Sequence, residues 1–277
     1  AVLLLLAACA GGPRSGGSGE TARGWSVTDD RDVAAYDVEH YALDLVLDPA
    51  GRALDARCRV RLWPVDGALE RVVLDASGLN VRSVVDADGR ALAFESSSDA
   101  LHVVLAAPVP RGSFAEITER VHLTIAALFG LVAVGATTEI VLTMPRAWTA
   151  VAVGERIERE EDGTRARERW RMTFPHPPYL TAFVAGELAV ETDAWDGVPL
   201  TFAGPPAQKA ELRAAFEETD EILAWLSATT GVRYPHAGYA QTCVDDFPFG
   251  GMEYVSATTL TASALPDAPG LRDEGNL

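Results

Sequence analysis

Apolar and polar side chains mostly alternate between residues 36 and 188. In segment 41–48 large apolar residues recur at every second position, and in segment 56–62 Ala, Cys, Val and Leu alternate with arginines. This period of two is typical of a β-strand with one buried and one solvated face. Turn-forming sequences at 48–51 and 86–89 separate such runs. The pattern predicts a mainly β fold for this part of the chain, an antiparallel β-sandwich or saddle.

The pattern changes after the Gly-Pro-Pro sequence at 204–206, which predicts a domain boundary and suits the start of a helix. Between residues 207 and 229 the apolar side chains fall on one helical face, and Gly231 is a natural end for that helix. An alternating run at 239–244 then predicts a strand that leads into a glycine-containing loop. The second part of the chain is therefore predicted to be α+β.

Composition limits the possible functions. The chain has 277 residues, of which 48% are hydrophobic, so it can bury a substantial core in one large or two ordinary domains. A formal net charge of −17 offers no basic surface for phosphates, and nucleic acid is excluded as a partner. Cys58 and Cys243 both lie in strand-like runs, where a buried thiol acting as a small hydrophobe is the simpler interpretation.

Residues 1–9 form a short apolar run that ends in small residues, the pattern of a secretory signal peptide remnant. The run is too short to span a bilayer, which needs about 20 apolar residues. Its end resembles a bacterial lipobox, and this resemblance implies lipidation at Cys9. Residues 10–32 contain a Gly/Ser-rich tether. We expect a chain that lacks its true beginning and a protein of the bacterial cell envelope, anchored to the membrane by lipid on the periplasmic or extracellular face.

The strongest candidate for a functional site is the run of residues Gly250, Gly251, Met252 and Glu253. Two adjacent glycines let the backbone turn sharply or approach a ligand. A carboxylate in a partly dry cleft attracts an ammonium group with about 4 kcal/mol at contact distance and an effective dielectric of about 20. An internal peptide segment would leave that carboxylate unpaired, which favours peptides with a free amino terminus. The alternative interpretation is a Gly-Gly hairpin turn followed by a solvent-facing Glu.

The sequence Gly-Gly-Met-Glu-Tyr at 250–254 resembles the Gly-x-Met-Glu-Asn exopeptidase motif of the M1 family of zinc aminopeptidases, with Tyr254 where the family usually has Asn. The resemblance implies that Glu253 binds the free α-amine of a peptide substrate. It also implies that the backbone of Gly250 and Gly251 lies along the peptide. Met252 is most simply a loop side chain that packs beneath the site.

The order of the predicted elements extends this resemblance over most of the chain. Residues 33–204 resemble the M1 amino-terminal β-domain, although the region 126–138 is shorter than in that family. Residues 205–277 resemble the beginning of the thermolysin-like catalytic domain, which is α+β. The resemblance therefore implies a fragment that contains the amino-terminal β-domain, shortened near 126–138, and the truncated beginning of the catalytic domain.

The resemblance implies zinc as cofactor, but the sequence contains no His-Glu-x-x-His pattern, and no two of its five histidines are three or four residues apart. We therefore expect no metal ligand and no catalytic residue within this chain, and we expect the zinc motif just beyond residue 277. The leading hypothesis is a fragment of a zinc-dependent aminopeptidase that hydrolyses the amino-terminal peptide bond. The alternative is a non-catalytic M1-like lipoprotein that acts as an envelope binding or scaffold protein.

Overall fold

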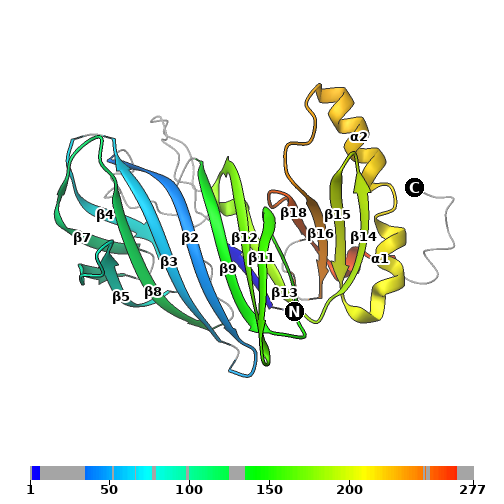
Figure 1. Cartoon of the computed structure of the whole chain (residues 1–277), viewed down its shortest axis with the longest axis horizontal. Helices are drawn as coiled ribbons and strands as arrows, with labels where there is room; N and C mark the ends of the chain where they lie inside the picture. Colours follow the sequence, from blue (N-terminus) through cyan, green and yellow to red (C-terminus); the bar gives the residue numbers. More distant parts are fainter. Residues whose placement is uncertain are drawn as a thin grey trace, which may run out of the picture.

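The computed structural model describes residues 2–6, 35–51, 53–65, 67–76, 79–97, 100–124, 135–245, 247 and 250–266. Strands dominate these residues, and the predicted mainly β class is confirmed. Figure 1 shows a β-rich body at one end of the long axis and a smaller sheet with two helices at the other. Among the described residues, neither helix is both long and apolar enough to span a membrane.

A seven-stranded sheet forms most of the β-rich body. All its neighbouring strands are antiparallel except β2 and β9, which run parallel. In spatial order the strands are β11 (Glu155–Asp162), β12 (Arg165–His176), β9 (Ala136–Pro145), β2 (Tyr36–Asp48), β3 (Ala53–Pro64), β8 (Ala115–Thr124) and β5 (Asn80–Asp86).

The β2–β3 hairpin shows why this sequence folds as strands. Tyr41, Leu43 and Leu45 alternate with less buried residues on β2, and Cys58 is buried on β3 opposite Leu43. The Asp48 carboxylate accepts hydrogen bonds from the backbone N–H groups of the turn at residues 50 and 51, which fixes the connection. The predicted alternation and the predicted turn are thus confirmed.

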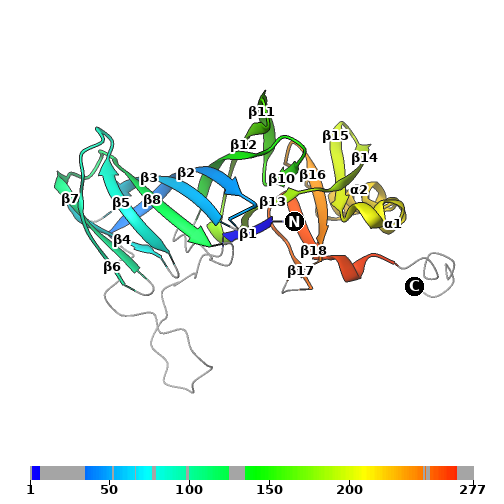
Figure 2. The ribbon, with the colours of Figure 1, turned by 90° about the horizontal axis from the view of Figure 1, so that it is seen from below.

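Two three-stranded sheets complete the body. The sheet β4 (Leu69–Asp75), β7 (Ala100–Val109) and β6 (Ala93–Ser96) shares one apolar core with the large sheet. The other consists of β1 (Val2–Leu6), β13 (Thr181–Gly186) and β10 (Thr149–Ala152), and β13 is buried along its whole length. Figure 2 shows β1 beside β13 near the middle of the molecule.

Several expectations from the sequence concern residues that the structure does not describe. Of the segment 1–9, only the backbone of β1 is described, and Cys9 and the tether 10–32 lie outside the described residues. The shortening predicted near 126–138 also falls mostly on residues outside them, and β9 begins at Ala136. These expectations stay predictions.

The second body is a mixed five-stranded sheet covered by helices. Its strands are β14 (Ala189–Trp195), β15 (Val198–Gly204), β16 (Tyr239–Val244), β18 (Ala257–Thr261) and β17 (Gly251–Met252), in that order. The pairs β15–β16 and β16–β18 are parallel, while β14–β15 and β17–β18 are antiparallel. The sheet thus begins at Ala189, upstream of the boundary predicted at 204–206. Apolar and polar residues alternate along the β14–β15 hairpin as they do along the earlier strands. This sequence pattern therefore does not indicate which sheet the hairpin joins.

The predicted helix 207–229 is divided. A 3₁₀ turn, η2 (Pro206–Gln208), leads into α1 (Lys209–Ala215), and α2 (Thr219–Thr230) follows. At the break, the Phe216 ring stacks on Phe202 of β15 at 5.3 Å, and the Thr219 hydroxyl donates to the Gln241 side chain. Gly231 ends α2 with φ +70°, as predicted.

Candidate functional site

The predicted exopeptidase motif lies on the outer strand of the five-stranded sheet. β17 pairs antiparallel with β18, with Gly251 opposite Leu260, and the Thr261 N–H donates to the Gly250 carbonyl at 3.1 Å. A Cβ added to Gly251 would lie 2.9 Å from the Leu260 side chain, whereas one added to Gly250 would meet nothing within 4 Å. Packing therefore explains why residue 251 is a glycine, but it does not explain why residue 250 is one. Neither glycine has a positive φ, and Gly250 lies at a bend directly before β17.

The side chains after Gly251 point to different environments. Met252 is partly buried and packs against the main apolar core, which contains residues of both bodies, while Glu253 is exposed. Tyr254 is buried, and burial raises the pKa of its phenol to about 12, with a smaller contribution from the Glu253 carboxylate. Glu253 is thus a solvent-accessible carboxylate near a buried phenol. Its role as the ligand of a peptide amine stays a prediction.

A tight turn holds the segment that follows Glu253. The Ala257 N–H donates to the Tyr254 carbonyl at 3.1 Å, and Ser256, at the third position of this turn, has φ +61°. Turns of this form usually carry Gly at that position because a side chain is disfavoured at positive φ. The sequence offers no signal for a left-handed Ser, and sequence analysis missed it.

The turn makes hydrogen bonds to both bodies of the molecule. The Ser256 hydroxyl accepts from the Gly154 N–H at 2.9 Å, and the Val255 N–H donates to the Leu180 carbonyl at 3.1 Å. On the other side, the Ser256 carbonyl accepts from the Ala240 N–H of β16 at 2.9 Å. The turn is therefore a junction between the β-rich body and the five-stranded sheet.

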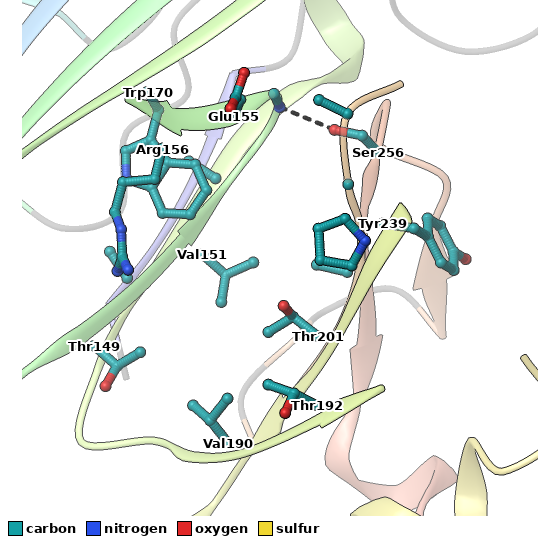
Figure 3. A pocket seen from close by; sticks show the side chains of 17 residues that line it. Thr149, Val151, Glu155, Arg156, Trp170, Val190, Thr192, Thr201, Tyr239 and Ser256 are labelled. Atoms are coloured by element: carbon teal, nitrogen blue, oxygen red, sulfur yellow. Dashed lines mark hydrogen bonds between the residues drawn. The ribbon is translucent and has the colours of Figure 1, made fainter. Parts of the chain in front are cut away.

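A cleft of about 430 Å³ lies between the strands β10–β12 and β14–β16 (Figure 3). Thr149, Val151 and Arg156 line it from the β-rich body, and Thr201 and Tyr239 line it from the five-stranded sheet. The motif 250–253 does not line this cleft, but Ser256 does, and Figure 3 shows its hydrogen bond to Gly154 as a dashed line.

The cleft wall is fixed around a buried carboxylate. Glu168 is fully buried, and it accepts from Arg156 at 3.1 Å and from the Trp170 indole N–H at 2.9 Å. The Arg156 guanidinium also lies 5.9 Å from the centroid of the Trp170 ring. These contacts hold Arg156 and Trp170 in place on the wall.

His176 and His40 make hydrogen bonds that hold local structure. The His176 ring bonds the Phe174 carbonyl at 2.9 Å and the Thr181 hydroxyl at 2.8 Å, and the His40 ring bonds the Thr137 hydroxyl at 2.8 Å. Burial lowers the pKa of both imidazoles. In the part of the chain that the structure describes, no three His, Cys, Asp or Glu side chains form a group that could hold a metal ion. The described residues thus do not fit a zinc site, and no chemical step can be assigned to zinc here.

Sequence analysis also missed a buried acid–thiol pair. Glu119 on β8 lies opposite Cys58 on β3, and both are buried among apolar side chains. Both described cysteines are free, as expected. The signal was available, because Ile117, Glu119 and Val121 follow the period of two and place a carboxyl group on the apolar face of β8.

Comparison with known proteins agrees with this architecture. No protein-family model matches the chain. Aminopeptidase N from Caulobacter vibrioides (strain ATCC 19089 / CIP 103742 / CB 15) is 30% identical over 109 residues, which cover 38% of this chain and only 13% of that protein's length.

The M1 zinc metallopeptidase from Deinococcus radiodurans has the same arrangement of elements, with a TM-score of 0.69 and 19% identity over 83% of this chain and 61% of that one. A mutant of it bound to a Tyr-Ser-Ala substrate gives a TM-score of 0.72 over the same shares. A mutant two-domain M1 zinc metallopeptidase bound to L-tryptophan gives 0.72 at 18% identity, over 86% of this chain and 63% of that one. The described part of the chain therefore has the fold of the M1 zinc metallopeptidases, the family that the motif at 250–254 resembles.

Proposed function

We propose that the intact protein is a zinc-dependent aminopeptidase and that Glu253 binds the terminal ammonium of its peptide substrate. The observation that carries the proposal is the position of Glu253, directly after β17, an edge strand of the five-stranded sheet. Similarity to an aminopeptidase N and the fold of M1 zinc metallopeptidases support it.

An outer strand suits the recognition of an extended peptide. On one side β17 pairs with β18, and no other described strand pairs with its second side. Backbone N–H and C=O groups at such an edge can hydrogen-bond a peptide that adds itself as a further strand. A carboxylate at the end of that strand then favours peptides whose first residue carries a free ammonium group.

The only support for zinc is the similarity to M1 zinc metallopeptidases. When bound, it would polarise the scissile carbonyl and activate a water molecule. We propose that its ligands lie outside the described residues, in the segment expected after residue 277. The role of this chain is to bind and orient the peptide.

The test is an assay of the full-length protein on amino-acid arylamides, with and without amino-terminal acetylation. Glu253→Gln should lower kcat/KM for the free-amine substrate by about fivefold or more, since it removes the charge that pairs with the ammonium, and such a pair contributes about 1 kcal/mol at an exposed carboxylate. Glu160→Gln, which changes an exposed carboxylate on β11, is the matched control and should have no effect. A zinc chelator should abolish the activity.

The same assay has two outcomes that refute the proposal. An active protein that Glu253→Gln leaves unchanged refutes the role of Glu253. A protein that binds free-amine peptides without hydrolysing them refutes catalysis and supports the envelope scaffold.

We also propose that the protein is a lipid-anchored protein of the cell envelope, attached through Cys9. The support is the apolar run and the lipobox-like sequence at 1–9. Lipidation would remove the residues before Cys9, and these include β1, whose backbone pairs with β13. The mass of the mature amino terminus therefore distinguishes an anchored protein from one that retains β1.

A further inference from the structure

One residue connects the predicted substrate carboxylate to both bodies of the molecule. Ser256 lies three residues after Glu253, at the third position of the turn 254–257. Its hydroxyl bonds the β-rich body at Gly154, and its carbonyl bonds the five-stranded sheet at Ala240. Ser256 is also buried, so neither bond competes with bulk water.

The backbone of Ser256 is strained, and the hydrogen bond of its hydroxyl compensates for that strain. At φ +61° a glycine would be accommodated without strain, whereas any side chain is disfavoured. A non-glycine residue at such a position calls for a compensating contact. The contact here is the hydrogen bond that the hydroxyl accepts from the Gly154 N–H.

The partner of that hydrogen bond is itself held rigidly. Gly154 has φ +89°, and a Cβ added to it would lie 2.2 Å from the Arg171 carbonyl oxygen. The backbone of Gly154 is thus pressed against β12, and its N–H has a fixed position. A second bond, from the Val255 N–H to the Leu180 carbonyl, joins the same turn to the segment before β13. These two bonds place the turn relative to the β-rich body.

We propose that Ser256 is a positioning residue that sets the place of Glu253 for the peptide amine. The inference rests on the proposed function of Glu253 and extends it to a residue that would not touch the substrate. Ser256 holds the turn against both bodies. Glu253 lies between β17 and the buried Tyr254, the first residue of that turn, so the position of the turn limits where the Glu253 backbone can lie.

Two substitutions separate positioning from simple stability. Ser256→Ala removes the hydroxyl and keeps a side chain at positive φ, so it loses the hydrogen bond and retains the strain. Ser256→Gly removes both the hydroxyl and the strain. The variants share the loss of the bond to Gly154, but the Gly variant should be the more stable of the two.

We expect both variants of the full-length protein to raise KM for a free-amine arylamide by about tenfold, the factor that one ordinary hydrogen bond provides, with kcat changed by less than about twofold. Amide hydrogen exchange at Gly154 and Val255 should accelerate by a similar factor in both. Asp196→Gly is the matched control. Asp196 lies in the turn of the β14–β15 hairpin, it too is a non-glycine residue at positive φ, and its carboxylate accepts a hydrogen bond from Arg233; its replacement should leave KM unchanged.

The outcomes are separable. If KM and the exchange at Gly154 stay at wild-type values in both variants, the inference is overturned. If KM follows stability, so that only Ser256→Ala is impaired, Ser256 is merely structural and the inference is likewise overturned. A wild-type protein without arylamidase activity refutes the aminopeptidase proposal instead, and the exchange measurements still decide whether Ser256 holds the turn.

Discussion

Glu119 should make the stability of the β-rich body depend on pH. Its carboxyl group is buried between β3 and β5, and its Oε2 atom has no hydrogen-bond partner among the described residues. Burial raises the pKa of this carboxyl from 4.5 to about 7, although a hydrogen bond with Cys58 acts in the opposite direction. A carboxyl with a raised pKa destabilises the folded state as pH increases.

The sign and size follow from the two pKa values. Below pH 4.5 the group is protonated in both the folded and the unfolded chain, so it adds no pH dependence. Between pH 4.5 and about 7 only the unfolded chain releases the proton, and the free energy of unfolding falls as pH rises. Above pH 7 the loss is constant. The rise of this pKa from 4.5 to about 7 corresponds to about 3 kcal/mol of lost stability.

Urea unfolding of wild type and Glu119→Gln at pH 4.5 and pH 8 measures this directly. The variant cannot titrate at residue 119, so its stability relative to wild type should increase by about 3 kcal/mol between the two pH values. Comparing the change with pH removes the constant cost of burying an amide. Glu160→Gln, an exposed carboxylate, should show no such change. A difference between Glu119→Gln and wild type that stays the same at both pH values would refute the raised pKa.

Two other predictions concern separate parts of the chain. Gly154→Ala should lower the free energy of unfolding by at least about 2 kcal/mol in denaturant titration, because its Cβ would collide with the Arg171 carbonyl at positive φ; wild-type stability would contradict this. Mass spectrometry of the membrane fraction should find a lipidated amino terminus at Cys9 that is absent from Cys9→Ser, and a mature protein that still carries residues 2–6 would contradict the anchor.

The sequence by itself determined the local features of this protein. Alternation predicts β2, β3 and the turn at Asp48 because the side-chain period of a strand depends only on neighbouring residues. Gly231 ends α2 for an equally local reason, its left-handed backbone. The motif at 250–254 likewise indicates the M1 fold through a short run of residues.

Only the tertiary structure decided the contacts between distant segments. The β14–β15 hairpin joins β16, and this choice of sheet depends on burial against α1 and α2 rather than on the hairpin's own pattern. Ser256 acquires its place through Gly154, 102 residues earlier in the chain. The donor in this hydrogen bond is a backbone N–H, a group that every residue except proline has. The sequence pattern around Gly154 therefore does not indicate that its N–H pairs with the Ser256 side chain.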